Sequence, residues 1–315
     1  CADLGIPPHD ILAVSGIGCS SNLPGYFNAN GMHTLHGRAL AVATGAKLGN
    51  HELNVVVTGG DGDGYGIGGN HFTHTARRNI DLTYLVMNNQ VYGLTTGQIS
   101  PTSALDMKTK STPFGSVEAP LNPLTSAIMN GATFVARSFS GDKPQLVPIL
   151  KAGLAHNGFA FVDVISPCVT FNDHEGSTKS YAYTRDNMHE VIETDFVPLR
   201  AEIKTDYADG SVQAITMHDG SVVKLRKVTE QYDPNDRSGV VDYLSETRSR
   251  GEIATGLLFL EAAGADLAEL RRVVIRHLLE GPRPRGLGST TLPASAAATS
   301  SAAGCTMRAI TWSNR

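Results

Sequence analysis

Cysteine is scarce in this sequence, and the few cysteines lie far apart. The four occur at positions 1, 19, 168 and 305, without the density of a disulfide scaffold and without a local C-x-x-C. A small disulfide-stabilised domain is therefore excluded, and a reducing, cytoplasmic setting is favoured. From composition alone, Cys19 and Cys168 are interpreted as small buried hydrophobes.

A strong charge of one sign and long apolar runs are also missing. The net charge is −4 over 315 residues, which gives no indication of nucleic-acid binding. No apolar run reaches the roughly 18 residues that a membrane span needs, and nothing resembles a secretory signal. Because the first residue is not Met, we expect residue 1 to be a cut or an incomplete start.

The apolar residues that are present form strand-like runs around a glycine-rich turn. The β-branched run Val55–Val57 enters the turn Gly59–Gly64, and a helix is expected after it. A second apolar run, Leu82–Met87, ends on Asn88 and Asn89. Strand, loop, helix and strand in this order build parallel sheets. Ligands of such open α/β sheets bind at the edge where the strands end.

The polar residues at that edge predict a diphosphate and metal site. Glycines let the backbone approach a phosphate closely, and N–H groups at a helix start donate to it. Mg²⁺ takes oxygen ligands partly from protein and partly from phosphate. Asp61 offers a carboxylate oxygen, and Asn89 offers an amide oxygen one strand later.

Three alternatives stay open for this turn. Gly64-x-Gly66-x-x-Gly69 matches the dinucleotide fingerprint, although the next strand ends without the ribose-binding acid. Asp61-x-Asp63 begins like an EF-hand loop, but Phe72 stands where a bidentate Glu belongs. The third alternative is a tight turn that binds nothing.

Strands and helices alternate along the first two thirds of the chain. Further buried strands are predicted at Ile11–Val14, Thr133–Ala136 and Phe159–Ile165, and helices at residues 36–50, 123–130 and 144–154. We read residues 22–34 as a loop. The fold class is therefore α/β, an open and mainly parallel sheet with helices on both faces.

The long segment Val91–Asn122 is poor in periodicity. Loops of this length are usually functional or disordered, so we predict a lid over the cofactor diphosphate and substrate. A surface excursion is the alternative. His36 also has two interpretations, as a hydrogen-bonded histidine at a helix start or as a functional side chain.

The residue pattern changes after residue 200. Residues alternate from Glu202 to Val228 and are interrupted by Asp209-Gly210 and Asp219-Gly220, which are hairpin turn signals. We predict an α/β domain over residues 1–200, then an antiparallel hairpin appendage with a closing helix over 201–280. Residues 281–315, rich in Pro, Ala, Ser and Thr, are expected to be a disordered tail.

Several short motifs in one order resemble a known family. Gly60-Asp61-Gly62, followed after 25 residues by Asn88-Asn89, resembles the thiamine-diphosphate motif. From about Leu4 to Leu260 the chain resembles the β subunit of 2-oxoacid:ferredoxin oxidoreductases, in particular the 2-oxoglutarate type. The matching stretches are residues 15–21, 36–38, 68–71, 92–95, 97–98, 100–102 and 166–172.

The resemblance implies a thiamine-diphosphate-binding domain. Mg²⁺ would be held by the side chains of Asp61 and Asn89 and by the carbonyl of Val91. His36 is the implied catalytic residue, which lies beside the thiamine and orients cofactor or substrate. The residues implied to bind or border the cofactor are Ile17, Gly18, Cys19, Ser20, His36, Gly60, Asp61, Gly62, Asp63, Asn89, Val91, Gly93, Leu94 and Thr95.

The same resemblance implies that Cys19 and Cys168 ligate iron. A [4Fe–4S] cluster needs four thiolates, but the C-x-x-C that relatives carry upstream of the first strand is absent, and Cys1 does not match it. We expect the missing pair to have been lost with the N-terminus.

The implied activity is oxidative decarboxylation of a 2-oxoacid, 2-oxoglutarate in the first place, with CoA. Acyl-CoA and CO₂ are the products, and ferredoxin takes the electrons. The carboxylate that activates the aminopyrimidine belongs to a separate α subunit in the family. We therefore expect an obligate αβ assembly and no activity from this chain alone.

Substrate choice has alternatives. Many relatives have basic residues where this sequence has Asn22 and Thr96, and a neutral residue gives up a charge-assisted hydrogen bond to the substrate carboxylate. A pyruvate-type or broad specificity therefore competes, although arginines of the α subunit could restore the charge. A non-oxidative thiamine-diphosphate enzyme and a non-enzymatic diphosphate-binding scaffold are the remaining alternatives.

Overall fold

The computed structural model describes residues 1–175, 177, 180–192, 212–216, 222–226 and 232–261. The chain divides into two units, Cys1–Arg272 and Val273–Arg315, and every described residue belongs to the first. The tail predicted for 281–315 lies outside the described residues. Within the described part, no helix combines the length and apolarity of a membrane span.

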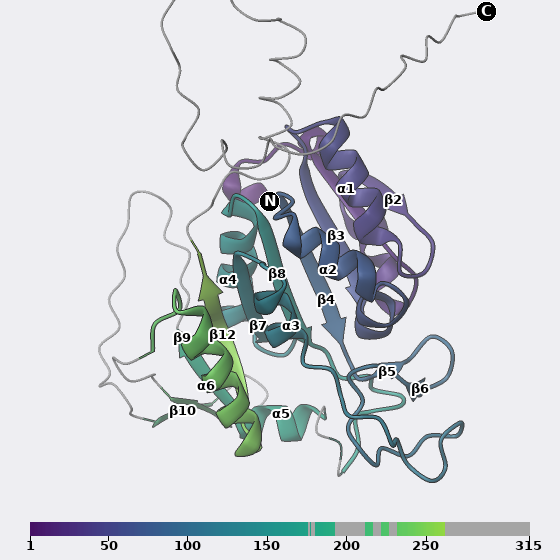
Figure 1. Cartoon of the computed structure of the whole chain (residues 1–315), viewed down its shortest axis with the longest axis vertical. Helices are drawn as coiled ribbons and strands as arrows, with labels where there is room; N and C mark the ends of the chain where they lie inside the picture. The colour runs from purple at the N-terminus through teal and green to yellow at the C-terminus, as the bar shows by residue number, and fades with distance from the viewer. Residues whose placement is uncertain (176, 178–179, 193–211, 217–221, 227–231, 262–315) are drawn as a thin grey trace, which may run out of the picture. The chain divides into compact units, whose positions relative to one another are not determined.

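An eight-stranded sheet forms the framework (Figure 1). In spatial order its strands are β2 (Asn30–His33), β1 (Ile11–Ser15), β3 (Asn54–Gly60), β4 (Leu82–Asn88), β8 (Phe159–Ile165), β7 (Phe134–Phe139), β12 (Ile253–Leu260) and β9 (Met188–Ile192). The first six are parallel to one another, whereas β12 runs antiparallel to β7 and parallel to β9. The predicted open, mainly parallel sheet is confirmed.

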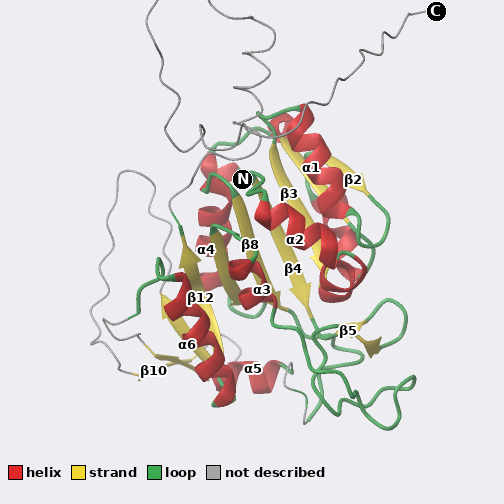
Figure 2. Cartoon of the chain, viewed as in Figure 1, coloured by secondary structure: helices red, strands yellow, loops and turns green. Residues whose placement is uncertain are grey.

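Helices cover both faces of this sheet (Figure 2). Alternate strand residues face opposite sides, so Val55 and Val57 of β3 join one apolar cluster and Val56 joins the other. The first cluster includes residues of α1 (Ala39–Gly49), α2 (Gly69–Arg77), α3 (Pro123–Met129) and α6 (Arg237–Ser249). The second is packed by α4 (Lys143–Ala155).

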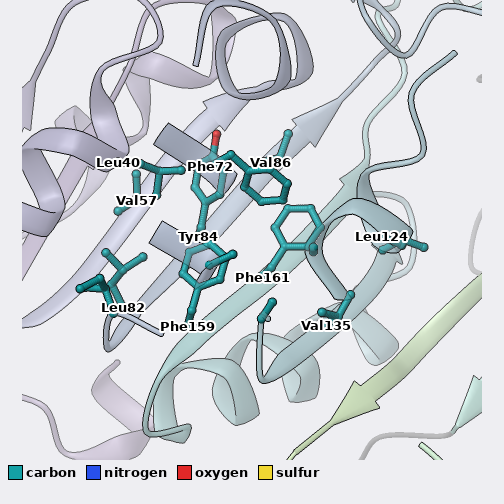
Figure 3. Close-up of a cluster of buried hydrophobic side chains, with 14 of the residues drawn as sticks. Leu40, Val57, Phe72, Leu82, Tyr84, Val86, Leu124, Val135, Phe159 and Phe161 are labelled. Carbon is teal, nitrogen blue, oxygen red and sulfur yellow. The ribbon is translucent and has the colours of Figure 1, made fainter. Parts of the chain in front are cut away.

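Aromatic rings fill the centre of the larger cluster (Figure 3). Phe72 of α2 lies with its ring centroid 5.1 Å from that of Phe161 and 6.1 Å from that of Tyr84, in tilted or edge contacts. Such pairs add to the stabilisation from burial. They fix the helix that follows the glycine-rich turn against β4 and β8.

Local sequence explains where two of the helices begin. The Asn122 side chain accepts a hydrogen bond from Thr125 N, and Pro123 occupies the first turn of α3. Asp142 caps α4 in the same way, by accepting from Gln145 N, and Pro144 lies in its first turn as predicted. Both pairs follow the preference for a polar cap followed by proline.

The interpretation of residues 22–34 as a loop was wrong. Cys19–Tyr26 is a 3₁₀ helix, and Asn30–His33 is the edge strand β2, paired in parallel with β1. All four residues of β2 are exposed, so no buried apolar face marks it in the sequence. Backbone pairing with β1 makes it a strand.

The C-terminal part contains the predicted antiparallel pair. β10 (Val212–Thr216) and β11 (Val222–Arg226) form a separate two-stranded antiparallel sheet. The turn signals at Asp209-Gly210 and Asp219-Gly220 lie outside the described residues. β12 joins the large sheet beside β7, and the domain limit at residue 200 stays a prediction.

Candidate functional site

A cavity of about 670 Å³ lies where the parallel strands end. Its walls come from the loops after β1, β3, β4 and β8, and its volume is typical of a small-molecule site (roughly 300–1,000 Å³). Every residue predicted above to bind cofactor, metal or iron lines it. The lining also includes residues that the sequence did not assign to a site: Met87, Tyr92, Ser166, Pro167, Val169 and Thr170.

Asp61, the first residue after β3, is the most informative group at this cavity. Its side chain is buried, with 1% exposure, and its Oδ2 accepts hydrogen bonds from Ser100 Oγ at 2.5 Å and Thr102 Oγ1 at 2.7 Å. Asn89 N donates to Oδ1 at 3.4 Å. Among the described residues no cationic side chain forms an ion pair with it.

This environment leaves a negative charge without compensation. Burial raises the pKa of the Asp61 carboxyl above its usual value, and the hydrogen bonds from Ser100, Thr102 and Asn89 oppose that rise. Buried charges in proteins are normally paired or bound to a metal. The position therefore suits a cation.

The other predicted metal ligands lie one strand further along. Asn89 follows β4 directly, and its Oδ1 accepts a hydrogen bond from Val91 N at 3.1 Å. Asn89 and Val91 line the same cavity as Asp61. One carboxylate, one amide oxygen and one carbonyl are hard ligands of the kind that Mg²⁺ prefers.

The acidic, imidazole and thiol side chains of the described residues do not form a metal site by themselves. In the described part of the chain, no three His, Cys, Asp or Glu side chains converge on one point. A cation at Asp61 would need carbonyl, amide and phosphate oxygens as well, which is how Mg²⁺ is usually bound beside a phosphorylated ligand. The ligand set thus fits a cation that binds together with a diphosphate.

Asp63 fastens three segments of the site to one another. Its buried Oδ1 accepts hydrogen bonds from Ile17 N at 3.0 Å and Gly37 N at 2.7 Å, and His36 Nδ1 lies 2.8 Å away. A Cβ on Gly16 would overlap the Asp63 carboxylate. The loop after β1, the start of α1 and the glycine-rich turn are therefore joined at one side chain.

The same carboxylate lies beside His36. With Nδ1 against Asp63, the imidazole keeps Nε2 for another partner, and the residue lines the cavity with its side chain 38% exposed. The glycine-rich turn itself is a π-helical turn, Gly62–Ile67, before α2. A Cβ on Gly62 would overlap the ring of Tyr92, so glycine is required there.

The sulfurs of Cys19 and Cys168 both lie close to Gly93. Each sulfur lies 3.5 Å from the position that a Cβ on Gly93 would occupy, so the two are at most twice that distance apart. Both are free thiols, and Cys19 is exposed. Cys1 lines a different cavity, between α4 and the sheet, and Cys305 lies outside the described residues.

The segment predicted as a lid begins with a very short hairpin. β5 (Val91–Tyr92) pairs with β6 (Gln98–Ile99) beyond the end of β4 (Figure 1). Thr96 in its turn has φ 80°, which is unusual for a β-branched residue. Thr96 and Asn22 do not line the cavity, and its lining includes neither Lys nor Arg among the described residues.

Sequence reasoning missed the hydroxyl groups beneath Asp61. Ser100 and Thr102 belong to a stretch that resembles the family, but nothing in their spacing says that both face a carboxylate about 40 residues earlier. The structure brings them there because β6 turns the chain back toward β3. A serine and a threonine flanking Pro101 were the available signal.

Comparison with known proteins agrees with this geometry. Residues 16–164 match the family described as "Thiamine pyrophosphate enzyme, C-terminal TPP binding domain". The fold and the site therefore place the chain among proteins with a thiamine-diphosphate-binding domain.

Individual relatives indicate a narrower family among the proteins with this domain. The chain is 50% identical over 181 residues to the 2-oxoacid:ferredoxin oxidoreductase subunit beta of Saccharolobus solfataricus, covering 57% of this chain and 59% of that one. It is 49% identical over 169 residues to the 2-oxoglutarate synthase subunit KorB of Methanocaldococcus jannaschii, covering 54% and 63%. The chain thus spans about three-fifths of the length of these curated relatives.

A solved structure covers more of the chain. The 2-oxoglutarate:ferredoxin oxidoreductase from Magnetococcus marinus, with 2-oxoglutarate, coenzyme A and succinyl-CoA bound, aligns with a TM-score of 0.71 and 36% identity. The alignment covers 90% of this chain and 81% of that chain. This chain belongs to the 2-oxoacid:ferredoxin oxidoreductase family, as a β subunit.

Proposed function

We propose that this chain binds thiamine diphosphate through Mg²⁺ at the strand-end cavity and works as the β subunit of a 2-oxoacid:ferredoxin oxidoreductase. The observation that carries the proposal is Asp61, a buried carboxylate without a cationic partner among the described residues, facing a cavity of suitable size. Mg²⁺ would be held by the Asp61 and Asn89 side chains and the Val91 carbonyl, together with the diphosphate.

The remaining cavity residues bind the cofactor diphosphate and orient the cofactor or substrate. The glycine-rich turn, with Gly60 and Gly62, lets the backbone lie close to a diphosphate. His36, whose Nδ1 lies 2.8 Å from Asp63 Oδ1, presents its other ring nitrogen to cofactor or substrate. Asp63 keeps the three loops in register, so its role is to shape the site.

Thiamine diphosphate, when bound, supplies the nucleophilic carbon and electron sink that decarboxylation of a 2-oxoacid requires. The net reaction converts one 2-oxoacid and one CoA into acyl-CoA, CO₂ and a proton, and passes two electrons to ferredoxin. An α subunit supplies the carboxylate that activates the aminopyrimidine. The assembly is therefore at least an αβ heterodimer, and free thiols suit a cytoplasmic one.

Cys19 and Cys168 are proposed as two ligands of an iron–sulfur cluster. Their sulfurs both lie close to Gly93, and both residues line the cavity. A [4Fe–4S] cluster needs four thiolates, and the described residues bring no other cysteine to this pair. The described part of the chain therefore forms half of a cluster site.

Two substrate classes compete for the cavity. The relatives and the structural neighbour favour 2-oxoglutarate. The lining without Lys or Arg favours a 2-oxoacid with one carboxylate, such as pyruvate, because a second buried carboxylate needs a cationic partner. An arginine contributed by the α subunit would decide in favour of 2-oxoglutarate.

The test is anaerobic purification of the full chain with its α subunit. Thiamine diphosphate, magnesium, iron and acid-labile sulfide are assayed, followed by CoA-dependent reduction of ferredoxin with 2-oxoglutarate or pyruvate. We expect cofactor, metal and iron in the complex, and turnover only in the complex. Turnover by this chain alone would contradict the requirement for an α subunit. A complex free of iron would contradict the oxidoreductase assignment and favour a non-oxidative thiamine-diphosphate enzyme.

A further inference from the structure

Two hydroxyl groups occupy one oxygen of Asp61 and leave the other nearly open. Ser100 Oγ and Thr102 Oγ1 both donate to Oδ2, at 2.5 and 2.7 Å, and both residues are buried. Oδ1 receives only the long 3.4 Å contact from Asn89 N. Charge-assisted hydrogen bonds of the shorter kind hold a carboxylate firmly, so the hydroxyls determine which oxygen remains for a ligand.

Asn88 limits which proton arrangement Thr102 can adopt. Its Oγ1 lies 3.1 Å from Asn88 Oδ1, and Asn88 Nδ2 donates to Asp163 Oδ1 at 3.0 Å. Because the NH₂ group must face the carboxylate, the Asn88 oxygen must face Thr102. A threonine has one hydroxyl proton, and the shorter bond directs it to Asp61. With that proton on the Asp61 side, the Asn88 oxygen lies next to Thr102 Oγ1 without a hydrogen bond between them, so Thr102 is left to donate to Asp61.

The hydroxyl-bearing loop is also tied to the loop that carries the other predicted metal ligands. Ser103 Oγ accepts a hydrogen bond from Ser100 N at 2.7 Å and donates to Gln90 O at 2.5 Å. Gln90 lies between Asn89 and Val91 in the sequence. The segments after β4 and after β6 are therefore fastened to each other next to Asp61.

From these contacts we propose that Thr102, assisted by Ser100, is a positioning residue for the metal site. It holds Asp61 by Oδ2 so that Oδ1 faces the cation and the cofactor diphosphate. The inference rests on the proposed function, because it assumes that the cation binds at Asp61. Residues that orient a metal ligand typically change metal affinity or activity about 10–100-fold when removed.

The test compares cation and cofactor binding in variants of the αβ complex. Mg²⁺ and thiamine diphosphate are removed by dialysis, and each is titrated back calorimetrically at a fixed concentration of the other. Thr102→Val keeps the shape and removes the hydroxyl, so we expect roughly 10–100-fold weaker Mg²⁺ binding. Thr102→Ser restores the hydroxyl and is expected to bind within about threefold of wild type. Ser100→Ala provides a second variant that tests the same oxygen.

The matched control is Thr83→Val. Thr83 Oγ1 is also buried and donates to Gly153 O at 3.1 Å, but it lies away from Asp61. We expect this variant to change the thermal unfolding midpoint of the metal-free complex and leave Mg²⁺ affinity unchanged. Equal weakening by Thr83→Val would overturn the positioning role, and so would wild-type affinity in both Thr102→Val and Ser100→Ala. A wild-type complex that binds neither Mg²⁺ nor thiamine diphosphate would overturn the proposed function itself, and this inference with it.

Discussion

Asp61 and Asp163 are both buried carboxylates near the same edge of the sheet, but their surroundings differ. Asp163 Oδ2 receives the guanidinium of Arg137, through Nε at 2.7 Å and an Nη at 2.6 Å. Its Oδ1 accepts from Tyr65 and Asn88, each at 3.0 Å. Asp61 has two hydroxyl donors and one long backbone contact, with no described cation.

This difference indicates that Asp163 has a structural role and Asp61 a functional one. Arg137 and Asp163 stand opposite each other in neighbouring parallel strands, so the chain neutralises this charge itself. The charge of Asp61 is oriented but left uncompensated, which costs stability unless something binds. A buried carboxylate that the fold holds in position without neutralising it is a candidate ligand for a cation.

The largest expected effect comes from breaking the compensated pair. Arg137→Met would leave Asp163 charged and unpaired in the core, which typically costs about 3–5 kcal/mol of unfolding free energy. Denaturant unfolding of the purified chain measures it. Arg250→Met, at an exposed ion pair, serves as the control and should unfold like wild type. A small loss for Arg137→Met would mean that Tyr65 and Asn88 suffice for Asp163.

Removing the uncompensated charge of Asp61 should stabilise the metal-free protein, in contrast to the destabilisation expected for Arg137→Met. Asp61→Asn is expected to weaken Mg²⁺-dependent thiamine diphosphate binding by at least about 100-fold, beyond the usual effect of residues that only orient a ligand. The same variant should raise the thermal midpoint of the metal-free protein, because a buried charge is lost. Calorimetric titration and a thermal melt measure the two, with Asp3→Asn at an exposed ion pair as the control. Unchanged binding would refute Asp61 as a ligand.

A milder variant tests how completely Asp163 is satisfied. Tyr65→Phe removes one donor from its Oδ1 and should cost about 1.5 kcal/mol, the low end for a hydrogen bond to a charged group. Cofactor binding should stay at the wild-type level, since Asp163 is neutralised by Arg137. Denaturant unfolding and the Mg²⁺ titration are compared on the same preparation. Weaker Mg²⁺ binding would show that the two carboxylates act as one network.

The smallest effect is a pH dependence. Burial raises the pKa of the Asp61 carboxyl in the folded protein above its usual value. The associated stability is fully present below the unfolded pKa and is lost as the pH rises through the folded pKa. The thermal midpoint of metal-free wild type, relative to Asp61→Asn, should therefore fall as the pH rises above about 4, the usual pKa of an aspartate. Parallel curves for the two proteins would contradict an uncompensated charge.

Much of the sheet could be predicted because its strands are short apolar runs that end in glycine or polar residues. Phe159–Ile165 and Leu82–Met87 match β8 and β4 closely. The residues predicted to surround the ligand all reach one cavity, since parallel strands bring their carboxyl ends to one edge. β2 was missed, because an exposed edge strand carries no apolar pattern.

The contacts around the two carboxylates were beyond prediction from sequence. The pairing of Arg137 with Asp163 depends on the register between β7 and β8, which a fully buried strand does not encode in its own alternation. The hydroxyls of Ser100 and Thr102 reach Asp61 only because the hairpin β5–β6 reverses the chain. Neither follows from local spacing.

The sequence by itself determined which chemical groups end the strands: the carboxylate of Asp61, the amide of Asn89 and the thiols of Cys19 and Cys168. These identities follow from position along the chain, since each comes within a few residues of the end of an apolar run. Only the tertiary structure decided which of the buried charges would be neutralised. That outcome depends on neighbours that are distant in sequence, and the energy of a buried charge is set by what surrounds it in space.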